Sequence, residues 1–194
     1  QQESSVDTTS LPNPAKDVVY GAQRATLHNG AVDLGSFGKG YAIDHITTLI
    51  QKDTHSDFVL VNGGGDVRLH NPNRYSYPLY LQHPFQTKQF THHLDHYHGS
   101  IANSNASLRR WTTKNTQKTY SHLLDLTDLD RHPDTLAAGT VCAPNAVDAD
   151  AAATLLTLLL PHENPGQLLS YPYLRIFADG SSRHTPDFPG TALA

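Results

Sequence analysis

The stretch Val32-Asp33-Leu34-Gly35-Ser36-Phe37-Gly38-Lys39-Gly40-Tyr41-Ala42-Ile43-Asp44 joins a short apolar strand to a helix, which we expect over residues 39–51. Three glycines in one junction indicate a tight turn or a backbone that closely approaches another group. The lysine adds positive charge where a helix N-terminus already favours an anion. The residues alone therefore indicate a phosphate-bearing ligand or, as the plainer alternative, a helix end packed tightly on a strand.

The spacing of this stretch excludes two common phosphate-binding motifs. Too few residues separate Gly35 from Gly38 and Lys39 for a P-loop, and Gly40 stands where that motif has a metal-binding hydroxyl. The order of the glycines is the reverse of the dinucleotide-binding fingerprint.

The bulk composition indicates one globular domain. The chain has 194 residues, of which 38% are hydrophobic and 16% charged, with a formal net charge of -4. That charge argues against a nucleic-acid binder, and a single cysteine excludes a disulfide framework. We expect a polar leader over residues 1–15, one domain over residues 16–180 and a loose tail over residues 181–194. Because the chain begins with Gln1 and has no methionine, it reads as a processed chain or a fragment.

Periodicity predicts an α+β fold with a mainly antiparallel sheet and two principal helices packed on it. The first helix should bury Ala42, Ile46, Leu49 and Ile50 on one face. The second should begin after an Asn145 cap and end at Pro161. We expect strands at residues 18–20, 25–28, 31–34, 58–61, 67–69, 121–124, 140–143 and 174–177, and two or three more within residues 77–102. Asn29 and Gly30 should form a hairpin turn between the second and third of these.

Three further segments carry candidate chemistry. Leu60–Asp66 ends a strand in Gly63, Gly64 and Gly65, which leaves backbone amides available to a ligand, although a simple turn or bulge reads the same way. In Tyr120–Asp125, His122 is a candidate general base, although a lone strand histidine is more often structural.

The third segment begins the second helix. Asp150 and Thr154 are four residues apart, so both side chains point the same way. A carboxylate and a hydroxyl are hard oxygen ligands, which suit Mg²⁺ better than zinc. The alternative is that Asp148 caps the helix and Asp150 is solvated.

In order and spacing, these segments resemble the FAD:protein FMN transferase family, also called the ApbE family. That family reads DLGGIAKGYAVD, LVNxGGD, a T-S-G turn, SHIIDP, VxVxAP and ADALATAL. The matching residues here are 33–44, 60–66, 102–106, 120–125, 140–144 and 149–155, and the resemblance covers roughly residues 17–180.

The resemblance implies a T-fold-like ApbE architecture and binding of FAD and Mg²⁺. It implies transfer of FMN from FAD to a threonine of an acceptor flavoprotein, with release of AMP. Asp150, Thr154 and the Gly38 carbonyl would hold the metal, and His122 would deprotonate the acceptor threonine. The cofactor-binding set would be Gly35, Gly38, Lys39, Gly40, Tyr41, Asp44, Gly64, Gly65, Asp66 and Ser104.

Two departures keep other functions open. The T-S-G turn appears as Ala102-Asn103-Ser104-Asn105-Ala106, and only 32 residues precede Asp33, fewer than in most members. The chain is therefore expected to be N-terminally truncated. A second chain completing the cleft, a FAD pyrophosphatase giving FMN and AMP, and a catalytically degenerate flavin- or partner-binding remnant are the alternatives. The resemblance also implies an extracytoplasmic location, at the cell surface or in the periplasm.

Overall fold

The computed structural model describes residues 14–86, 88–106, 110–113, 119–123, 136–159 and 162–193. The chain divides into two compact units, residues 1–34 and 35–194, which we describe separately. The division falls within the domain expected over residues 16–180. Most of the expected leader, residues 1–13, lies outside the described residues.

The first unit contains a short helix and one hairpin. Helix α1 spans Pro14–Asp17, and strand β1 (Val18–Tyr20) pairs antiparallel with β2 (Ala25–Leu27). The turn between them is closed by the Gly21 amide, which donates to the Arg24 carbonyl at 2.7 Å. The expected strand over residues 31–34 is wrong, because β2 uses β1 as its partner rather than the segment after Asn29 and Gly30.

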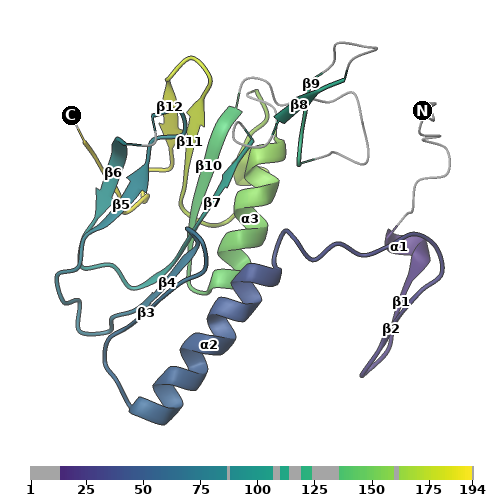
Figure 1. Ribbon diagram of the computed structural model, residues 1–194, viewed down its shortest axis with the longest axis horizontal. Helices are drawn as coiled ribbons and strands as arrows, with labels where there is room; N and C mark the ends of the chain where they lie inside the picture. Colours follow the sequence, from purple (N-terminus) through teal and green to yellow (C-terminus); the bar gives the residue numbers. More distant parts are fainter. Residues whose placement is uncertain are drawn as a thin grey trace. The chain divides into compact units, whose positions relative to one another are not determined.

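The second unit is organised around a six-stranded antiparallel sheet in the order β12-β11-β10-β7-β4-β3 (Figure 1). The strands are β12 (Ser182–His184), β11 (Tyr173–Phe177), β10 (Leu136–Ala143), β7 (Gly99–Asn105), β4 (Val67–His70) and β3 (Val59–Asn62). A smaller sheet has the order β13 (Thr191–Ala192), β6 (Phe90–Leu94) and β5 (Leu79–Gln82). A separate hairpin pairs β8 (Arg110–Thr112) with β9 (Thr119–Ser121).

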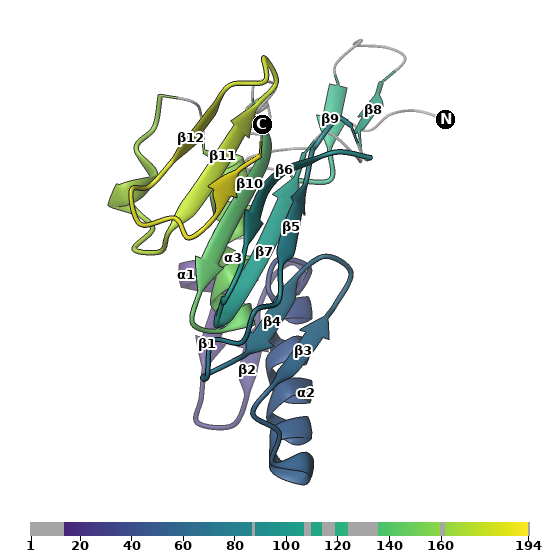
Figure 2. The same cartoon turned by 90° about the vertical axis from the view of Figure 1, so that its left-hand side faces the viewer.

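Two helices cover one side of the large sheet, and the smaller sheet lies on the other (Figures 1 and 2). Helix α3 (Ala146–Leu158) contacts β7 and β10, and α2 (Gly38–Thr54) contacts α3, β3 and β4. Successive side chains of β7 point to opposite faces of the sheet and so belong to two different cores. Ile101 packs in the core with Leu94 and Leu174, and Ala102 packs in the core with residues of α3. The expected α+β architecture with two principal helices is confirmed.

The buried face of α2 differs from the expected one. Its buried residues are Gly40, Ile43 and Thr47, whereas Ile46 and Leu49 are 45% and 46% exposed. Helix α2 approaches α3 at Gly40. The face that contacts α3 is therefore the one that begins with this glycine, and not the face that carries the most apolar residues. Thr47 tolerates burial because its hydroxyl donates to the Ile43 carbonyl at 2.8 Å.

The C-terminal residues also differ from the loose tail that we expected. β12 pairs with β11, and β13 pairs with β6, so segments of residues 181–194 extend both sheets. Each strand is only two or three residues long, which is too short to show a period-2 pattern in the sequence. No helix among the described residues is long and apolar enough to cross a membrane.

Candidate functional site

The two helices of the second unit meet at Gly40. A Cβ atom placed there would lie 2.3 Å from the Ala146 carbonyl oxygen and 2.7 Å from the Cα atom of Val147. Both neighbours are backbone of α3, which cannot rotate away as a side chain would. Only glycine therefore allows α2 and α3 this approach, and the glycine-rich junction serves helix packing at this position.

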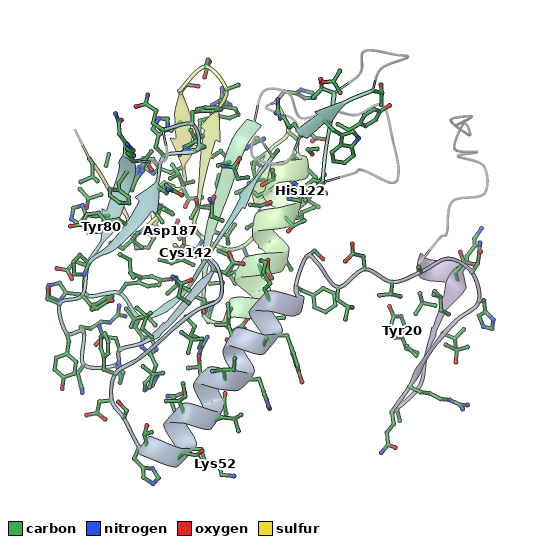
Figure 3. The ribbon with its side chains drawn as sticks, in the orientation of Figure 1. Tyr20, Lys52, Tyr80, His122, Cys142 and Asp187 are labelled. Atoms are coloured by element: carbon green, nitrogen blue, oxygen red, sulfur yellow. The ribbon has the colours of Figure 1, made fainter. Side chains whose placement is uncertain are left out.

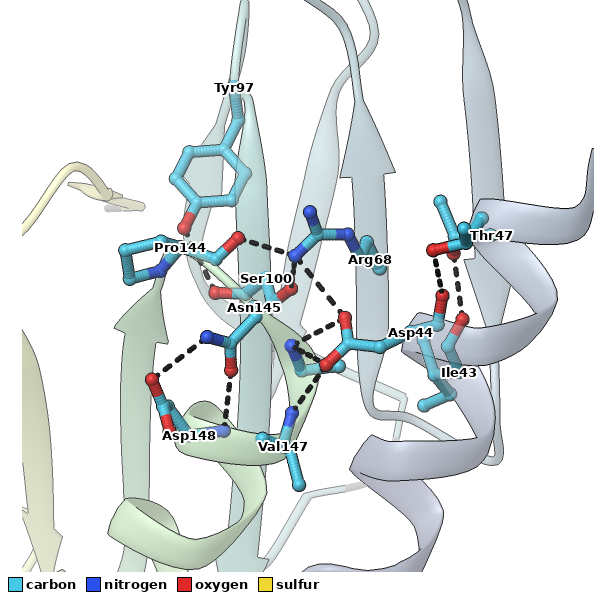
Figure 4. Close-up of polar contacts among 12 residues, drawn as sticks. Ile43, Asp44, Thr47, Arg68, Tyr97, Ser100, Pro144, Asn145, Val147 and Asp148 are labelled. Atoms are coloured by element: carbon cyan, nitrogen blue, oxygen red, sulfur yellow. Dashed lines mark hydrogen bonds and ion pairs between the residues drawn. The ribbon is translucent and has the colours of Figure 1, made fainter. Parts of the chain in front are cut away.

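The N-terminal amides of α3 are satisfied by protein groups (Figure 4). The Asn145 side chain accepts a hydrogen bond from the Asp148 amide at 2.8 Å. The Asp44 carboxylate, carried by α2, accepts from the amides of Ala146 and Val147, each at 2.9 Å. The cofactor-binding role that the resemblance gave Asp44 stays a prediction, but in this structure its carboxylate caps α3.

Arg68 of β4 completes this junction, as Figure 4 shows. Its Nη1 atom lies 3.2 Å from Asp44 Oδ1 and 3.3 Å from the Ser100 hydroxyl, and it also donates to the Pro144 carbonyl. No local pattern indicated Arg68, because its partners lie far away along the chain and are brought together only by the fold.

Lys39, Asp66 and Asp150 form the central cluster of the site. The Lys39 ammonium donates to Asp66 and, at 2.9 Å, to Asp150 Oδ1. The two carboxylates are buried, with Asp66 3% and Asp150 4% exposed, whereas the Lys39 side chain is 52% exposed. Three motifs from α2, the β3–β4 turn and α3 thus converge on one partly accessible ammonium group.

The charges in this cluster oppose the effect of burial. Burial by itself lowers the pKa of Lys39, but hydrogen bonds to Asp66 and Asp150 outweigh it, so the pKa is raised. Burial raises the pKa of Asp66 more than the Lys39 ammonium and the Asn103 amide lower it. The lysine therefore stays protonated as the fixed positive charge of the site.

The carboxylate of Asp150 is held in place from both sides. Its Oδ2 atom accepts from the Gly40 amide at 3.0 Å, and its Oδ1 atom faces Lys39.

Of the other two predicted metal ligands, Thr154 is half-buried one turn further along α3, and Gly38 is the first residue of α2. Among the described residues no group of three or more His, Cys, Asp or Glu side chains could hold a metal. The predicted donors are a carboxylate, a hydroxyl and a carbonyl, a hard oxygen set that fits Mg²⁺ chemically.

The β3–β4 turn borders the cluster with open backbone. Gly64 and Gly65 have φ values of +83° and +110°, and a Cβ atom at either would meet nothing within 4 Å. The Gly65 amide donates to the Asn62 side chain at 2.8 Å, and the Gly63 amide to the Asp66 carbonyl at 2.8 Å. The residues thus form a glycine turn that directs Asp66 inward and leaves space outside.

Tyr41 lies at the start of α2 on its accessible side. The ring is 65% exposed and stacks on His45, with centroids 6.3 Å apart and an interplanar angle of 4°. The N-cap residue of α2, Phe37, makes no side-chain cap hydrogen bond. This end of α2 therefore presents an aromatic ring close in sequence to Lys39. The predicted ligand residues Gly38 and Gly40 lie in its first turn, and Gly35 lies just before it.

Ser104 lies in a strand rather than in the turn that the resemblance implied. Residues 102–105 belong to β7, where Ser104 pairs with Gly139 of β10. The Ser104 carbonyl accepts from the Thr157 hydroxyl at 3.3 Å, and the neighbouring Asn103 amide donates to Asp66 Oδ1 at 3.2 Å. Pairing with β10 keeps this segment extended, because asparagines in place of the family's threonine and glycine do not force a turn here.

His122 follows the end of β9 and is exposed (Figure 3). Asp125, which follows His122 in the SHIIDP-like segment, lies outside the described residues. The assignment of His122 as a base stays a prediction.

The comparison with family models identifies the chain. The model described as "ApbE family" matches residues 4–171. This chain belongs to the ApbE family. No curated protein matches it.

Solved structures show the ApbE fold directly. The ApbE protein from Thermotoga maritima superposes with a TM-score of 0.77 at 22% identity and covers 89% of this chain. The apo form of the flavinyl transferase ApbE from Pseudomonas stutzeri gives 0.71 at 19% identity over 99% of the chain. The flavin transferase ApbE from Vibrio cholerae gives 0.68 at 19% identity over 93%.

The chain spans about three fifths of these ApbE proteins. The matched regions cover 58%, 60% and 59% of the Thermotoga, Pseudomonas and Vibrio chains. The six-stranded sheet, α2 and α3 therefore represent the ApbE fold only over that part of the relatives' length.

Proposed function

We propose that this protein is a Mg²⁺-dependent transferase that moves FMN from FAD to a threonine of an acceptor flavoprotein and releases AMP. The observation that carries the proposal is the convergence of Lys39, Asp66 and Asp150, which come from three of the segments that resemble ApbE motifs. Membership of the ApbE family and the printed names of the solved flavin transferases support it.

The chemistry suits transfer across a pyrophosphate. The acceptor oxygen forms a bond to the flavin-side phosphorus while the bridging P–O bond breaks, and AMP leaves with the electron pair. Lys39 offers a fixed positive charge to the pyrophosphate oxygens, because its ammonium is half-exposed and stays protonated. His122 takes the hydroxyl proton of the acceptor threonine.

Asp150, Thr154 and the Gly38 carbonyl would hold the magnesium ion. When bound, the ion would neutralise charge that develops on the phosphoryl oxygens. The Gly40 amide fixes Asp150 by its Oδ2 atom, and the Oδ1 atom faces the Lys39 ammonium. The open glycine turn at Gly64 and Gly65 and the ring of Tyr41 would border the flavin nucleotide.

A binding remnant is the second candidate function, and one observation favours it. The segment that corresponds to the family's T-S-G turn lies in strand β7, where Ser104 pairs with Gly139. We also propose that a second chain contributes to the flavin site and that the complex works outside the cytoplasm. Hydrolysis of FAD to FMN and AMP differs only in using water as the acceptor.

The test is a calorimetric titration of FAD with and without Mg²⁺, followed by chromatography of the flavin and AMP. Transfer or hydrolysis predicts Mg²⁺-dependent binding. FMN together with AMP would identify hydrolysis, whereas binding without turnover would direct the search to the acceptor. Failure to bind FAD in either condition would contradict the transferase proposal for this chain alone and favour the remnant.

Two variants make the result specific. Asp150→Asn keeps the shape of the side chain but removes its charge, so it should abolish the Mg²⁺ dependence. Asp53→Asn on the exposed side of α2 is the matched control and should behave as the wild type. His122→Ala should slow transfer more than it weakens FAD binding, and equal losses would remove its role as a base.

A further inference from the structure

A cavity lies beside the β11–β12 hairpin, which is the yellow hairpin of Figure 1. Its volume is about 240 Å³, and its lining includes His162, Glu163, Asn164, Tyr173, Arg175 and Arg183. None of these residues belongs to the Lys39 cluster, and the proposed flavin chemistry uses none of them. The cavity therefore needs its own explanation.

Two arginines stand directly opposite each other on its wall. Arg175 of β11 pairs with Arg183 of β12, so both side chains leave the same face of the hairpin. Both guanidinium groups approach the ring of Phe177, at 5.2 Å for Arg175 and 5.5 Å for Arg183. Like charges in directly opposed positions destabilise a strand pair. The repulsion between these two arginines therefore lies at the lining of the cavity.

Two backbone carbonyl groups orient the Arg175 guanidinium. This residue is 2% exposed, and its guanidinium donates to the Leu159 carbonyl at 2.8 Å and to the Glu163 carbonyl at 3.4 Å. Carbonyl oxygens orient a guanidinium group but do not cancel its charge. Burial lowers the pKa of Arg175, and the Arg183 charge adds to this effect, whereas Tyr173 and Glu163 oppose it; an arginine nevertheless remains protonated in proteins. Arg175 is thus a positioned, desolvated cation.

Acidic groups nearby neutralise the cavity only in part. Glu163 lines it, so the two arginines outnumber the one carboxylate. Asp179 in the β11–β12 turn feels the Arg183 charge, but its Oδ1 atom accepts from the Ser181 amide and hydroxyl at 2.9 and 2.6 Å. Arg183 forms no ion pair within 4.0 Å with any residue that the structure describes.

We propose that this cavity binds a phosphate group between Arg175 and Arg183. Guanidinium groups present paired donors that match the oxygens of phosphate, and an anion between them would remove the cross-strand repulsion. Asn164 also lines the cavity, and its Oδ1 atom accepts from the Gly166 amide, so the remaining polar group of its side chain is a hydrogen-bond donor. The volume lies below the range typical of pockets for larger ligands, so it suits a single phosphate group rather than a dinucleotide.

The experiment is thermal unfolding of the full chain in inorganic phosphate, titrated against sodium chloride at constant ionic strength with EDTA present. We expect the wild type to gain a saturable rise in Tm of a few degrees from phosphate and none from chloride. Arg183→Gln should lose this rise. Its Tm without phosphate should equal or exceed that of the wild type, because the variant removes one of two opposed charges from an exposed position.

Three further arms fix the location and source of the anion. Arg24→Gln, an exposed arginine of the first unit, is the matched control and should keep the full rise. Lys39→Gln should also keep it, because the flavin-site lysine does not line this cavity. Titration with AMP in place of phosphate distinguishes a phosphate monoester from free phosphate: a larger rise that also needs Arg183 would identify the monoester.

Two results would overturn the proposal. One is a wild type that phosphate stabilises no more than chloride does. The other is a phosphate effect that survives in Arg183→Gln, which would place the anion elsewhere, at the flavin site if Lys39→Gln removes it. Neither result depends on flavin turnover, so failure here and failure of the transferase proposal are separate outcomes.

Discussion

The two helices of the second unit differ in how completely the protein uses them. Helix α3 buries residues on several faces, from Ala146 to Thr157, and its first amides are capped by Asn145 and Asp44. Helix α2 buries only Gly40, Ile43 and Thr47, begins without a side-chain cap and keeps an exposed outer face. The difference divides their roles: α3 stabilises the sheet, and the start of α2 carries exposed residues of the ligand site that we propose.

Replacing Gly40 with alanine should produce the largest effect, because it forces the helices apart. The new Cβ atom would meet the α3 backbone at 2.3 Å, so we expect a loss of about 3 kcal/mol or more in the free energy of unfolding. Urea denaturation measures it. Ala42→Ser adds one atom at an exposed position of the same helix and should change stability by less than about 0.5 kcal/mol. Equal values for the two variants would contradict the close approach.

Truncating isoleucines on the two sides of α2 tests which face is buried. Ile43 is 2% exposed and Ile46 45% exposed. We expect Ile43→Ala to cost about 2–4 kcal/mol, because it leaves a cavity, and Ile46→Ala to cost less than about 1 kcal/mol. Equilibrium unfolding of both variants gives the comparison. A larger loss at Ile46 would restore the face expected from the sequence.

Removing the carboxylate of Asp44 should uncap α3 from the side of α2. Asp44→Ala leaves the amides of Ala146 and Val147 without their acceptor and Arg68 without its ion pair. We expect a loss of about 1–2 kcal/mol, of which Asp44→Asn should recover a part because its amide oxygen still accepts. Asp53→Ala, on the same helix but exposed, serves as the control in urea unfolding. A loss no greater than that of the control would remove Asp44 as a cap.

The smallest effect concerns pH. The folded pKa of Lys39 is raised above 10.5, so its contribution to stability is present below that value and is lost as the pH rises through the folded pKa. The free energies of unfolding of the wild type and Lys39→Met should therefore converge above pH 10.5. The difference is small throughout, because the side chain is half-exposed to solvent. A constant difference across that range would contradict the assignment.

Much of the architecture follows from local signals. The Asn145 cap, the helix after it and the strand before Gly63 are each specified by a few neighbouring residues, and the structure contains them. The predicted hairpin around Asn29 and Gly30 is wrong, because a turn sequence forms a hairpin only when a strand lies on both sides of it. Strand β2, which precedes this turn, pairs with β1 instead.

The candidate site divides in the same way. The sequence singled out Lys39, Asp66 and Asp150 separately, each next to glycines or at a helix start, and the structure joins them. It did not indicate that Gly40 would contact the backbone of α3 or that Arg68 would join Asp44 to Ser100. Those contacts connect residues far apart in the chain, and no local pattern encodes them.

The sequence by itself determined the fold class, the two helices and the motifs that mark an ApbE protein, because periodicity, caps and glycine spacing are local properties of the chain. Only the tertiary structure decided which face of α2 is buried, which carboxylate caps α3 and which two carboxylates hold Lys39. The physical reason is that burial and charge pairing depend on which segments meet in space. Here the face of α2 that contains Gly40 is buried, because glycine lets the α3 backbone come close, and the most apolar face of α2 stays exposed.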